Sequence, residues 1–326
     1  MNDYRPNAPT GVILMNLGTP SEPTVRGVRN FLRAFLSDPR VVELPRVLWL
    51  PILYGFILPF RSPRVARLYK QIWTDGGSPL KVITEAQAAA LQQRFSPETM
   101  QVTYAMTYGE PSFEQRVEEL ERRGVENILV LPLYPQYSAT TTASIYDQYA
   151  RLIMQQRVVS SIQVHKHYYD SPDYIRALAE SINDYWLENP RPQRLLFSFH
   201  GIPKRCVDRG DPYEIHCRST AEAVVEELKL GDSEWAISFQ SRLGKAEWLQ
   251  PYTDKLLQQW AETGVASVHV VCPAFSADCL ETIEEIDVEN RKLFLAHGGR
   301  TYGVIPCLND SERHISMMEK IVRSYV

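Results

Sequence analysis

Carboxylates recur at a fixed spacing in the stretch SVHVVCPAFSADCLETIEEIDVE, which runs from Ser267 to Glu289. Glu281, Glu285 and Glu289 follow one another at intervals of four residues. In an α-helix of 3.6 residues per turn, each such step drifts by about 40° around the axis, so the acids would form a leaning row. A π-bulge, which is frequent at functional sites, would straighten that row. Acids arranged in this way could pass a divalent cation inward.

The same acids also have a purely structural interpretation. Asp278 and Glu281, three residues apart, fit a helix capping box. Glu284, Glu285 and Asp287 would then belong to a solvated helix face. The sequence leaves the cation path and the solvated face open.

A histidine occupies a comparable position earlier in the chain. RLLFSFHG predicts a buried strand over Leu195–Phe199, with His200 and Gly201 at its carboxyl end. An imidazole accepts a proton near neutral pH, and the glycine lets backbone and ligand approach each other. The alternative is a histidine that is hydrogen-bonded in an ordinary loop.

The surrounding elements explain how these residues would meet. Ser267–Cys272 is predicted as a buried strand, Pro273–Ala277 as a loop, and a helix opens at Asp278. Ligands of open α/β sheets bind outside the carboxyl ends of strands. The strand–helix alternation along the whole chain predicts parallel sheets covered by helices on both faces. We expect no nucleotide, because neither G-x-G-x-x-G nor a phosphate loop is present.

A long apolar segment, Val47–Phe60, is interrupted by prolines and is too short to span a bilayer. It is either a buried helical segment or an apolar lip over a flat hydrophobic substrate or a membrane surface. Arg61, Arg64 and Arg67 follow it, and such arginines suit a ligand with an anionic edge. Alone, they would be ordinary surface charges.

Length and composition limit the remaining possibilities. A chain of 326 residues predicts two domains. Hydrophobic and charged contents of 44% and 23% are typical of a soluble globular protein, and a net charge of -4 argues against a nucleic-acid partner. Five cysteines without a C-x-x-C pair indicate a reducing compartment. With no signal-peptide pattern at the N-terminus, we expect a cytoplasmic protein.

Several motifs together resemble those of the ferrochelatases. They are NLGTPS, GGSPL, LPLYPQYS, FSFHGIPKR with a later RGDPY, FQSRLG and CPAFSADCLETIEEI. Their order and spacing hold across nearly the whole chain. The resemblance implies a lyase of haem biosynthesis that inserts Fe²⁺, its substrate, into a porphyrin. It also implies a chelatase-like α/β fold of two doubly wound, Rossmann-like domains with parallel four-stranded sheets that face a cleft.

The resemblance also assigns roles to residues. His200 and Glu281 match the family's essential histidine and acid, which act in catalysis and on the metal. A second group matches the acids of the metal route: Glu285, Glu289 and Asp278. A third group lies where family members touch the porphyrin or its propionates: Arg61, Tyr69, Ser78 and Tyr134.

Two departures from the family pattern matter. Some members have a histidine where this chain has Cys279, and we interpret that residue as a buried thiol. Some members also bind an iron–sulfur cluster through C-terminal cysteines. Here no cysteine follows Cys307, and Ala139 stands where such a cluster takes its internal cysteine. We therefore expect no iron–sulfur cluster.

The expected domains are 1–165, which carries the apolar lip, and 166–306, which carries the metal site; a C-terminal helix of about 307–326 would pack back on the first. Protoporphyrin is the expected substrate. Coproporphyrin, a cobalt or nickel tetrapyrrole chelatase, and a non-catalytic porphyrin or haem carrier are the alternatives. The expected partners are porphyrin and ferrous iron, with peripheral membrane contact through Val47–Phe60.

Overall fold

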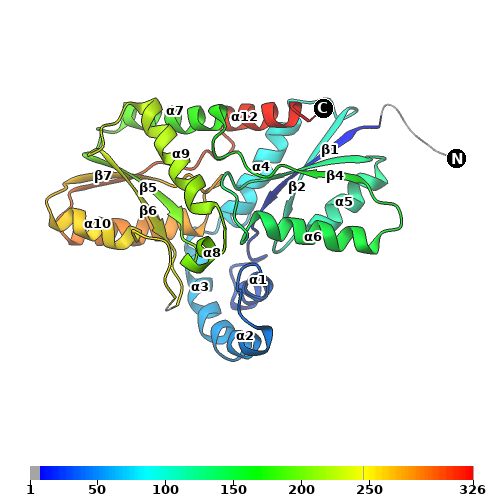
Figure 1. Cartoon of the computed structure of the whole chain (residues 1–326), viewed down its shortest axis with the longest axis horizontal. Coiled ribbons are helices and arrows are strands. Elements are labelled where there is room, and N and C mark those ends of the chain that lie inside the picture. The colour runs from blue at the N-terminus through cyan, green and yellow to red at the C-terminus, as the bar shows by residue number, and fades with distance from the viewer. Residues whose placement is uncertain (1–7, 245, 326) are drawn as a thin grey trace. The chain divides into compact units, whose positions relative to one another are not determined.

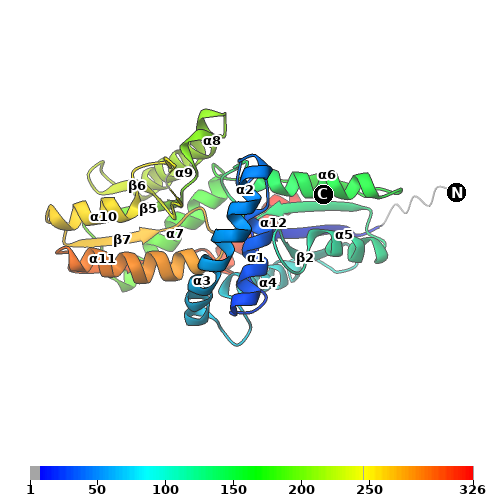
Figure 2. The same cartoon turned by 90° about the horizontal axis from the view of Figure 1, so that it is seen from below.

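The computed structural model describes residues 8–244 and 246–325, which fold into two compact units (Figures 1 and 2). The first unit comprises the chain up to Tyr134, residues Ala139–Lys166 and the chain from Ile315 onward; the second comprises Pro135–Ser138 and His167–His314. The division expected from the sequence differs in giving 135–138 to the first domain and in starting the returning C-terminal segment at 307. Part of the N-terminal stretch considered above, residues 1–7, lies outside the described residues.

The first unit is built on a parallel sheet with the strand order β2-β1-β3-β4. Its strands are β1 (Thr10–Asn16), β2 (Met100–Met106), β3 (Asn127–Pro132) and β4 (Ser161–Val164). The central strands β1 and β3 are almost wholly buried, as expected for a parallel sheet that is covered on both faces.

Helices cover the two faces of this sheet. Helix α4 (Pro79–Gln92) packs along β2, and Figure 1 shows α5 (Phe113–Arg122) and α6 (Thr142–Gln155) on the opposite face. Helix α12 (Glu312–Arg323) reaches the end of α4, where Arg94 and Glu319 form an ion pair at 3.9 Å.

Four consecutive helical segments of the first unit form what we call the helical arm. They are α1 (Val25–Leu36), α2 (Arg46–Ile52), the π-helix η1 (Leu53–Ile57) and α3 (Leu58–Ile72). The indole of Trp49 donates a hydrogen bond of 2.7 Å to the carbonyl of Leu36, which ties α2 to α1. Leu53 and Leu58 are also buried. The segment Val47–Phe60 is thus neither wholly buried nor wholly exposed, because its other face carries exposed apolar side chains.

The second unit repeats the plan with the strand order β6-β5-β7-β8. Its strands are β5 (Arg194–His200), β6 (Trp235–Gln240), β7 (Ser267–Val271) and β8 (Thr301–Val304). Helices α7 (Pro172–Glu188) and α9 (Tyr213–Leu228) cover one face, and α10 (Thr253–Glu262) and α11 (Arg291–Ala296) cover the other (Figure 1). Both units therefore have the predicted doubly wound, parallel α/β architecture.

Short helical segments precede the longer helices α9 and α10 of this unit. The stretch 202–213 contains the short helix α8 (Lys204–Asp208) and ends at the first residue of α9. The first two turns of α9 have a buried face that carries Tyr213, His216 and Cys217. Helix α10 begins at Thr253, two residues after Pro251.

In the described part of the chain, no helix is both long enough and apolar enough to cross a bilayer.

The two faces of the helical arm give a matched test of this packing. Leu53 is 0% exposed and Leu48 is 65% exposed. We expect Leu53→Ala to lower the free energy of unfolding by about 2–5 kcal/mol, because it leaves a cavity in a closed core. Leu48→Ala should change it by less than about 0.5 kcal/mol. Urea denaturation of both variants measures the difference, and equal losses would contradict the assigned burial.

Candidate functional site

The carboxyl edge of the second sheet gathers the residues that could do chemistry. His200 is the last residue of β5 and lies opposite Gln240, the last residue of β6. On the other side of β5, β7 ends at Val271, and its loop leads to the π-helix η2 (Glu281–Asn290). Because parallel strands all end at the same edge, the segments that follow β5, β6 and β7 meet there.

His200 is half-buried and held in a defined tautomer. Its Nδ1 lies 2.7 Å from the carbonyl oxygen of Gly201. A carbonyl only accepts hydrogen bonds, so Nδ1 carries the proton and the lone pair of the neutral ring is on Nε2. Gly201 in turn donates its N–H to the carbonyl of Gln240 at 2.8 Å. A Cβ at position 201 would lie only 2.9 Å from that carbonyl, so the close approach requires glycine.

The acidic row lies on η2, which is a π-helix over all ten of its residues. Its i→i+5 hydrogen bonding widens each turn, so a step of four residues comes closer to a full turn than in an α-helix. Glu281 and Glu285 are half-buried and Glu289 is exposed. The row therefore runs along one side of the helix from the carboxyl edge of the sheet outward to solvent. The helix starts at Glu281 and not at Asp278 as predicted.

Glu285 is the acid most strongly shaped by its surroundings. One carboxylate oxygen accepts the backbone N–H of Ser241 at 2.8 Å, and the other accepts the Ser241 hydroxyl. Burial raises the pKa of Glu285, while the hydrogen bonds from Ser241 and the charge of His200 act in the opposite direction. Glu281 adds to the rise through like-charge repulsion. His200, Glu281 and Glu285 thus lie within electrostatic reach of one another.

Ser241 reaches this position through unusual backbone geometry. Its φ of 66° lies in the left-handed region, which residues other than glycine seldom adopt. Strain of this kind is held in place by surrounding contacts and is concentrated at functional sites. Here both donors of Ser241 contact a single carboxylate.

Gln240 links the three strand ends and was not identified from the sequence. It is 2% exposed, and its amide nitrogen donates to the backbone carbonyl of Glu281 at 3.4 Å. Its amide oxygen accepts from the hydroxyl of Ser198 at 2.8 Å, and that hydroxyl lies 2.9 Å from the hydroxyl of Thr253. The motif FQSRLG could have indicated this residue. Its glutamine is the last residue of a buried strand and its serine comes next, at the same edge of the sheet as His200.

Asp278 has its carboxylate engaged in structural hydrogen bonds. It accepts from the hydroxyl of Thr282 at 2.8 Å, from the side chain of Asn309 at 2.7 Å and from the backbone of Cys307 at 3.4 Å. These bonds replace the predicted capping box with Glu281 and fasten the start of the helix to the segment after β8. Cys279 is 5% exposed, as expected of a buried thiol, and burial raises its pKa.

The residues predicted to contact a porphyrin belong to the first unit. Arg61 and Tyr69 lie on α3, where Arg61 is half-buried and Tyr69 is buried against Trp73 in an edge-to-face contact. Ser78 is buried, and its hydroxyl caps α4 by accepting the N–H of Lys81. Tyr134 is buried immediately after β3, and burial raises its pKa.

Ser241 gives a direct test of this electrostatic arrangement. We expect Ser241→Ala to raise the pKa of Glu285 further, because the backbone donor remains while the hydroxyl donor is lost. The pKa is measured by NMR titration of the carboxyl carbon, assigned by comparison with Glu285→Gln. Ser233→Ala, at an exposed position of the same unit, is the control. An unchanged or lowered pKa in Ser241→Ala would contradict the assignment.

Comparison with known proteins gives a consistent result. The family model described as Ferrochelatase matches residues 9–326. The ferrochelatase of Aeromonas hydrophila subsp. hydrophila is 49% identical over 315 residues, which are 96% of this chain and 97% of that protein. The ferrochelatase of Acinetobacter baumannii (strain ACICU) is 50% identical over 317 residues, 96% of this chain and 94% of that protein.

Solved structures of chelatases share the fold at low sequence identity. The sirohydrochlorin chelatase SirB from Bacillus subtilis subspecies spizizenii, in complex with cobalt, has a TM-score of 0.57 and 13% identity, and the match covers 97% of this chain and 94% of that chain. CbiX, a terminal enzyme of sirohaem biosynthesis in denitrifying bacteria, has a TM-score of 0.53 and 11% identity, with coverage of 98% and 99%. These matches confirm the predicted chelatase-like fold. From its sequence over nearly its whole length, this chain is a member of the ferrochelatase family.

Proposed function

We propose that this protein inserts Fe²⁺ into protoporphyrin IX and releases two protons, which makes protohaem in the last step of haem biosynthesis. The observation that carries the proposal is the cluster at the carboxyl edge of the second sheet. There His200 and Glu281 both act electrostatically on the half-buried Glu285. Membership of the ferrochelatase family supports the reaction class.

Metal insertion requires the removal of two protons from pyrrole nitrogens. The free Nε2 lone pair of His200 is suited to accept one of them, since Nδ1–H is already committed to Gly201. The imidazolium that forms would be stabilised by the negative charge of Glu285. Glu281, half-buried on the neighbouring segment, would bind the incoming metal or take the second proton.

The acidic row supplies a route for the substrate ion. Glu289 is exposed and would meet hydrated Fe²⁺ first, and Glu285 and Glu281 are progressively nearer the sheet. Each step would exchange water for carboxylate oxygen, a ligand that divalent cations accept. Asp278, although predicted as part of this route, contributes by anchoring the helix, because its oxygens already accept three hydrogen bonds.

Porphyrin binding is assigned to the first unit. The guanidinium of Arg61 suits a propionate, with which it would form charge-assisted hydrogen bonds. Tyr69 and Tyr134 would offer apolar ring surface to the macrocycle, and Ser78 would offer a hydroxyl to its edge.

Membership of the ferrochelatase family favours protoporphyrin as the substrate over coproporphyrin and over a cobalt or nickel tetrapyrrole. The intact acidic row favours catalysis over a carrier role. The absence of an iron–sulfur cluster and the cytoplasmic location stay predictions from the sequence.

The catalytic assignment predicts large losses of rate. We expect His200→Ala and Glu281→Gln each to lower the rate of protohaem formation by about 10²–10⁴-fold, as for removal of a proton-transfer group. Absorbance of product formed from protoporphyrin and Fe²⁺ measures the rate. The same assay with coproporphyrin or Co²⁺ tests the alternative substrates.

Matched controls are available in the second unit. His297 also has its Nδ1 within 2.8 Å of a backbone carbonyl, that of Leu293, and is likewise half-buried. His297→Ala and the exposed Glu227→Gln should keep wild-type rates. If His200→Ala or Glu281→Gln folds and turns over like these controls, the assignment of that residue is wrong.

A peripheral membrane contact through Val47–Phe60 is the second part of the proposal. Val47 is 85%, Phe56 65% and Phe60 76% exposed on the helical arm. Large apolar side chains exposed side by side are typical of interaction surfaces. A helical segment with one apolar face exposed can lie in the interfacial region of a bilayer.

Vesicle flotation tests this contact. We expect Leu48→Glu and Phe56→Glu each to weaken partitioning onto phosphatidylcholine vesicles by about 10-fold or more, because each removes apolar surface that would be buried on binding. Leu187→Glu and Ile215→Glu change exposed apolar residues of the second unit and should leave partitioning unchanged. Equal partitioning of all four variants and the wild type would exclude the arm as the contact.

A further inference from the structure

Positive charge is concentrated on the helical arm. Residues 25–72 contain eight arginines and one lysine but only two acids, Asp38 and Glu43, although the whole chain has a net charge of -4. Asp38 is buried and accepts hydrogen bonds from the hydroxyl of Tyr108 and the backbone of Arg40. The arm therefore presents a strongly cationic surface on an otherwise acidic protein, and such a surface attracts anionic partners.

The exposed face of α1 carries three arginines. Arg26, Arg29 and Arg33 are exposed and lie three and four residues apart, on one side of the helix. Among the residues that the structure describes, their side chains take part in no ion pair or hydrogen bond. By contrast, Arg40 pairs with Asp147 at 2.9 Å on the same unit. Three neighbouring guanidinium groups without counter-charges repel one another, and an anionic ligand would relieve that repulsion.

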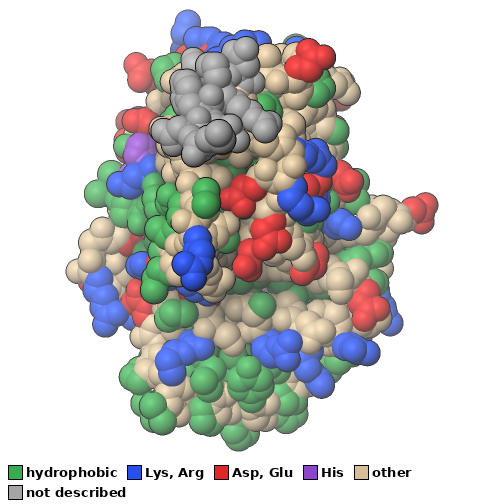
Figure 3. Space-filling view, turned by 90° about the vertical axis from the view of Figure 1, so that its right-hand side faces the viewer, with side chains coloured by type: hydrophobic (Ala, Val, Ile, Leu, Met, Phe, Trp, Pro, Cys, Tyr) green, Lys and Arg blue, Asp and Glu red, His purple; other side chains and the backbone are tan. Residues whose placement is uncertain are grey.

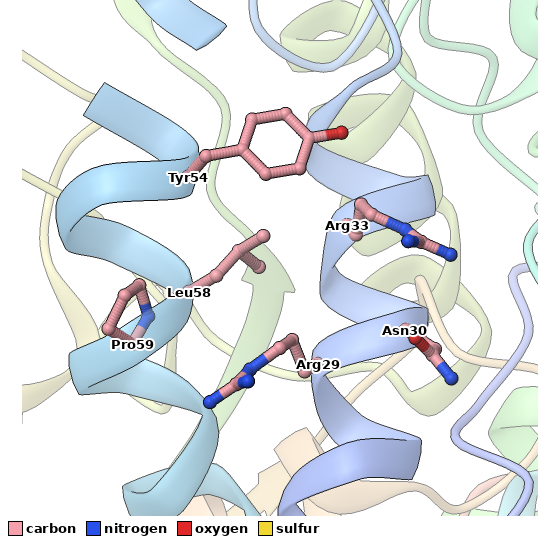
Figure 4. Close-up of a pocket in the computed structure, with 6 residues that line it drawn as sticks. All are labelled: Arg29, Asn30, Arg33, Tyr54, Leu58 and Pro59. Atoms are coloured by element: carbon pink, nitrogen blue, oxygen red, sulfur yellow. The ribbon is translucent and has the colours of Figure 1, made fainter. Parts of the chain in front are cut away.

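A pocket of about 490 Å³ lies between α1 and the η1–α3 segment. It is lined by Arg29, Asn30, Arg33, Tyr54, Leu58 and Pro59. Figure 4 shows Arg29 reaching from α1 towards α3, while Tyr54 and Leu58 reach from the opposite wall towards α1. One wall is therefore cationic and polar, and the other is apolar. A ligand that fits it has an anionic group beside a hydrocarbon portion.

Exposed apolar side chains continue from this pocket along the arm. Tyr54 is itself 52% exposed, and Leu48, Phe56 and Phe60 are more exposed still. Figure 3 shows hydrophobic side chains gathered at the lower end of that view, with Lys and Arg side chains in a band above them. This order, apolar side chains flanked by basic ones, matches the order of acyl chains and phosphates across the face of an anionic bilayer.

We propose that the helical arm binds anionic lipid bilayers and that Arg29 and Arg33 hold the phosphate of a phospholipid headgroup at the pocket between α1 and α3. The proposal rests on the membrane contact proposed above and adds lipid selectivity to it. Leu48, Phe56 and Phe60 enter the acyl boundary, and the unpaired arginines of α1 lie at the depth of the phosphates. Binding is then tighter on anionic than on neutral lipid and weakens with salt, because exposed charges are screened.

Vesicle partitioning of the full chain separates the two contributions. Wild-type protein is measured on phosphatidylcholine vesicles and on vesicles that also contain phosphatidylglycerol, at low and at high salt. The double variant Arg29→Gln, Arg33→Gln should lose roughly 30-fold in affinity on the anionic vesicles, since each basic residue near such a surface contributes about fivefold. On neutral vesicles it should match the wild type.

The control removes the same net charge elsewhere in the first unit. Arg122 and Arg151 are exposed on α5 and α6, and each donates to a backbone carbonyl of its own helix. Arg122→Gln, Arg151→Gln should keep wild-type selectivity. If the two double variants behave alike, the headgroup site is overturned and the effect is one of net charge.

The remaining outcomes distinguish the two proposals. Equal wild-type affinity for neutral and anionic vesicles leaves the apolar contact standing and overturns the headgroup site. No wild-type binding to either overturns both. Release of the protein from anionic vesicles by protoporphyrin, together with weaker porphyrin binding by the Arg29→Gln, Arg33→Gln variant, would assign these arginines to the substrate instead. Release by inorganic phosphate at matched ionic strength would assign them to a free anion.

Discussion

The site depends on the carboxylate of Glu285, which is partly shielded from bulk water and must still be able to carry a negative charge. Burial disfavours the ionised form of Glu285, and the nearby Glu281 disfavours it further. Two hydrogen-bond donors of Ser241 favour the ionised form of Glu285, and so does the charge of His200. A carboxylate balanced in this way can respond to changes of charge beside it, which is what delivery of a dication and removal of protons require.

The second sheet makes this balance possible by geometry. Parallel strands β5, β6 and β7 end together, so an imidazole, a polar turn and an acidic helix come from three distant parts of the chain to one edge. Gln240 fixes their spacing, because its buried amide joins Ser198 on β5 to the backbone of Glu281. A fully buried amide with satisfied donors and acceptors holds its neighbours more firmly than a solvated one. Asp278 does the same for the far side of the helix through Asn309 and Thr282.

The helical arm combines a buried face with an exposed apolar face in one segment. Trp49, Leu53 and Leu58 are buried, the indole of Trp49 bonds to Leu36 of α1, and α3 packs along α1. The residues between them face outward, and they are apolar where a soluble surface would usually be polar. Because successive residues of a helix point in different directions around its axis, a single apolar run supplies both the packed surface and the exposed one. The arginines of α1 then add charge beside the apolar face, and the arm becomes amphipathic as a whole.

Sequence patterns alone predict the class of fold and the residues at the strand ends. The alternation of strands and helices predicts parallel sheets, of which the structure has two. The buried apolar run before His200 predicts that this histidine lies at the carboxyl end of a strand, as it does. Such patterns are readable because the period of apolar residues reports which faces are buried. The order and spacing of the motifs indicated the ferrochelatase family, which the comparisons confirm.

Contacts between polar groups from distant segments, by contrast, follow from the three-dimensional packing. Ser241 and Glu285 are 44 residues apart, and no local pattern relates them. The π-helical form of η2 was foreseen as an option but not decided, because nothing in ETIEEIDVEN distinguishes it from an ordinary helix. The role of Asp278 changed for the same reason: an acid before a helix reads as a cap, whereas its partners Asn309 and Cys307 come from beyond β8. Side-chain pairing across distant segments follows from packing, which a one-dimensional pattern does not encode.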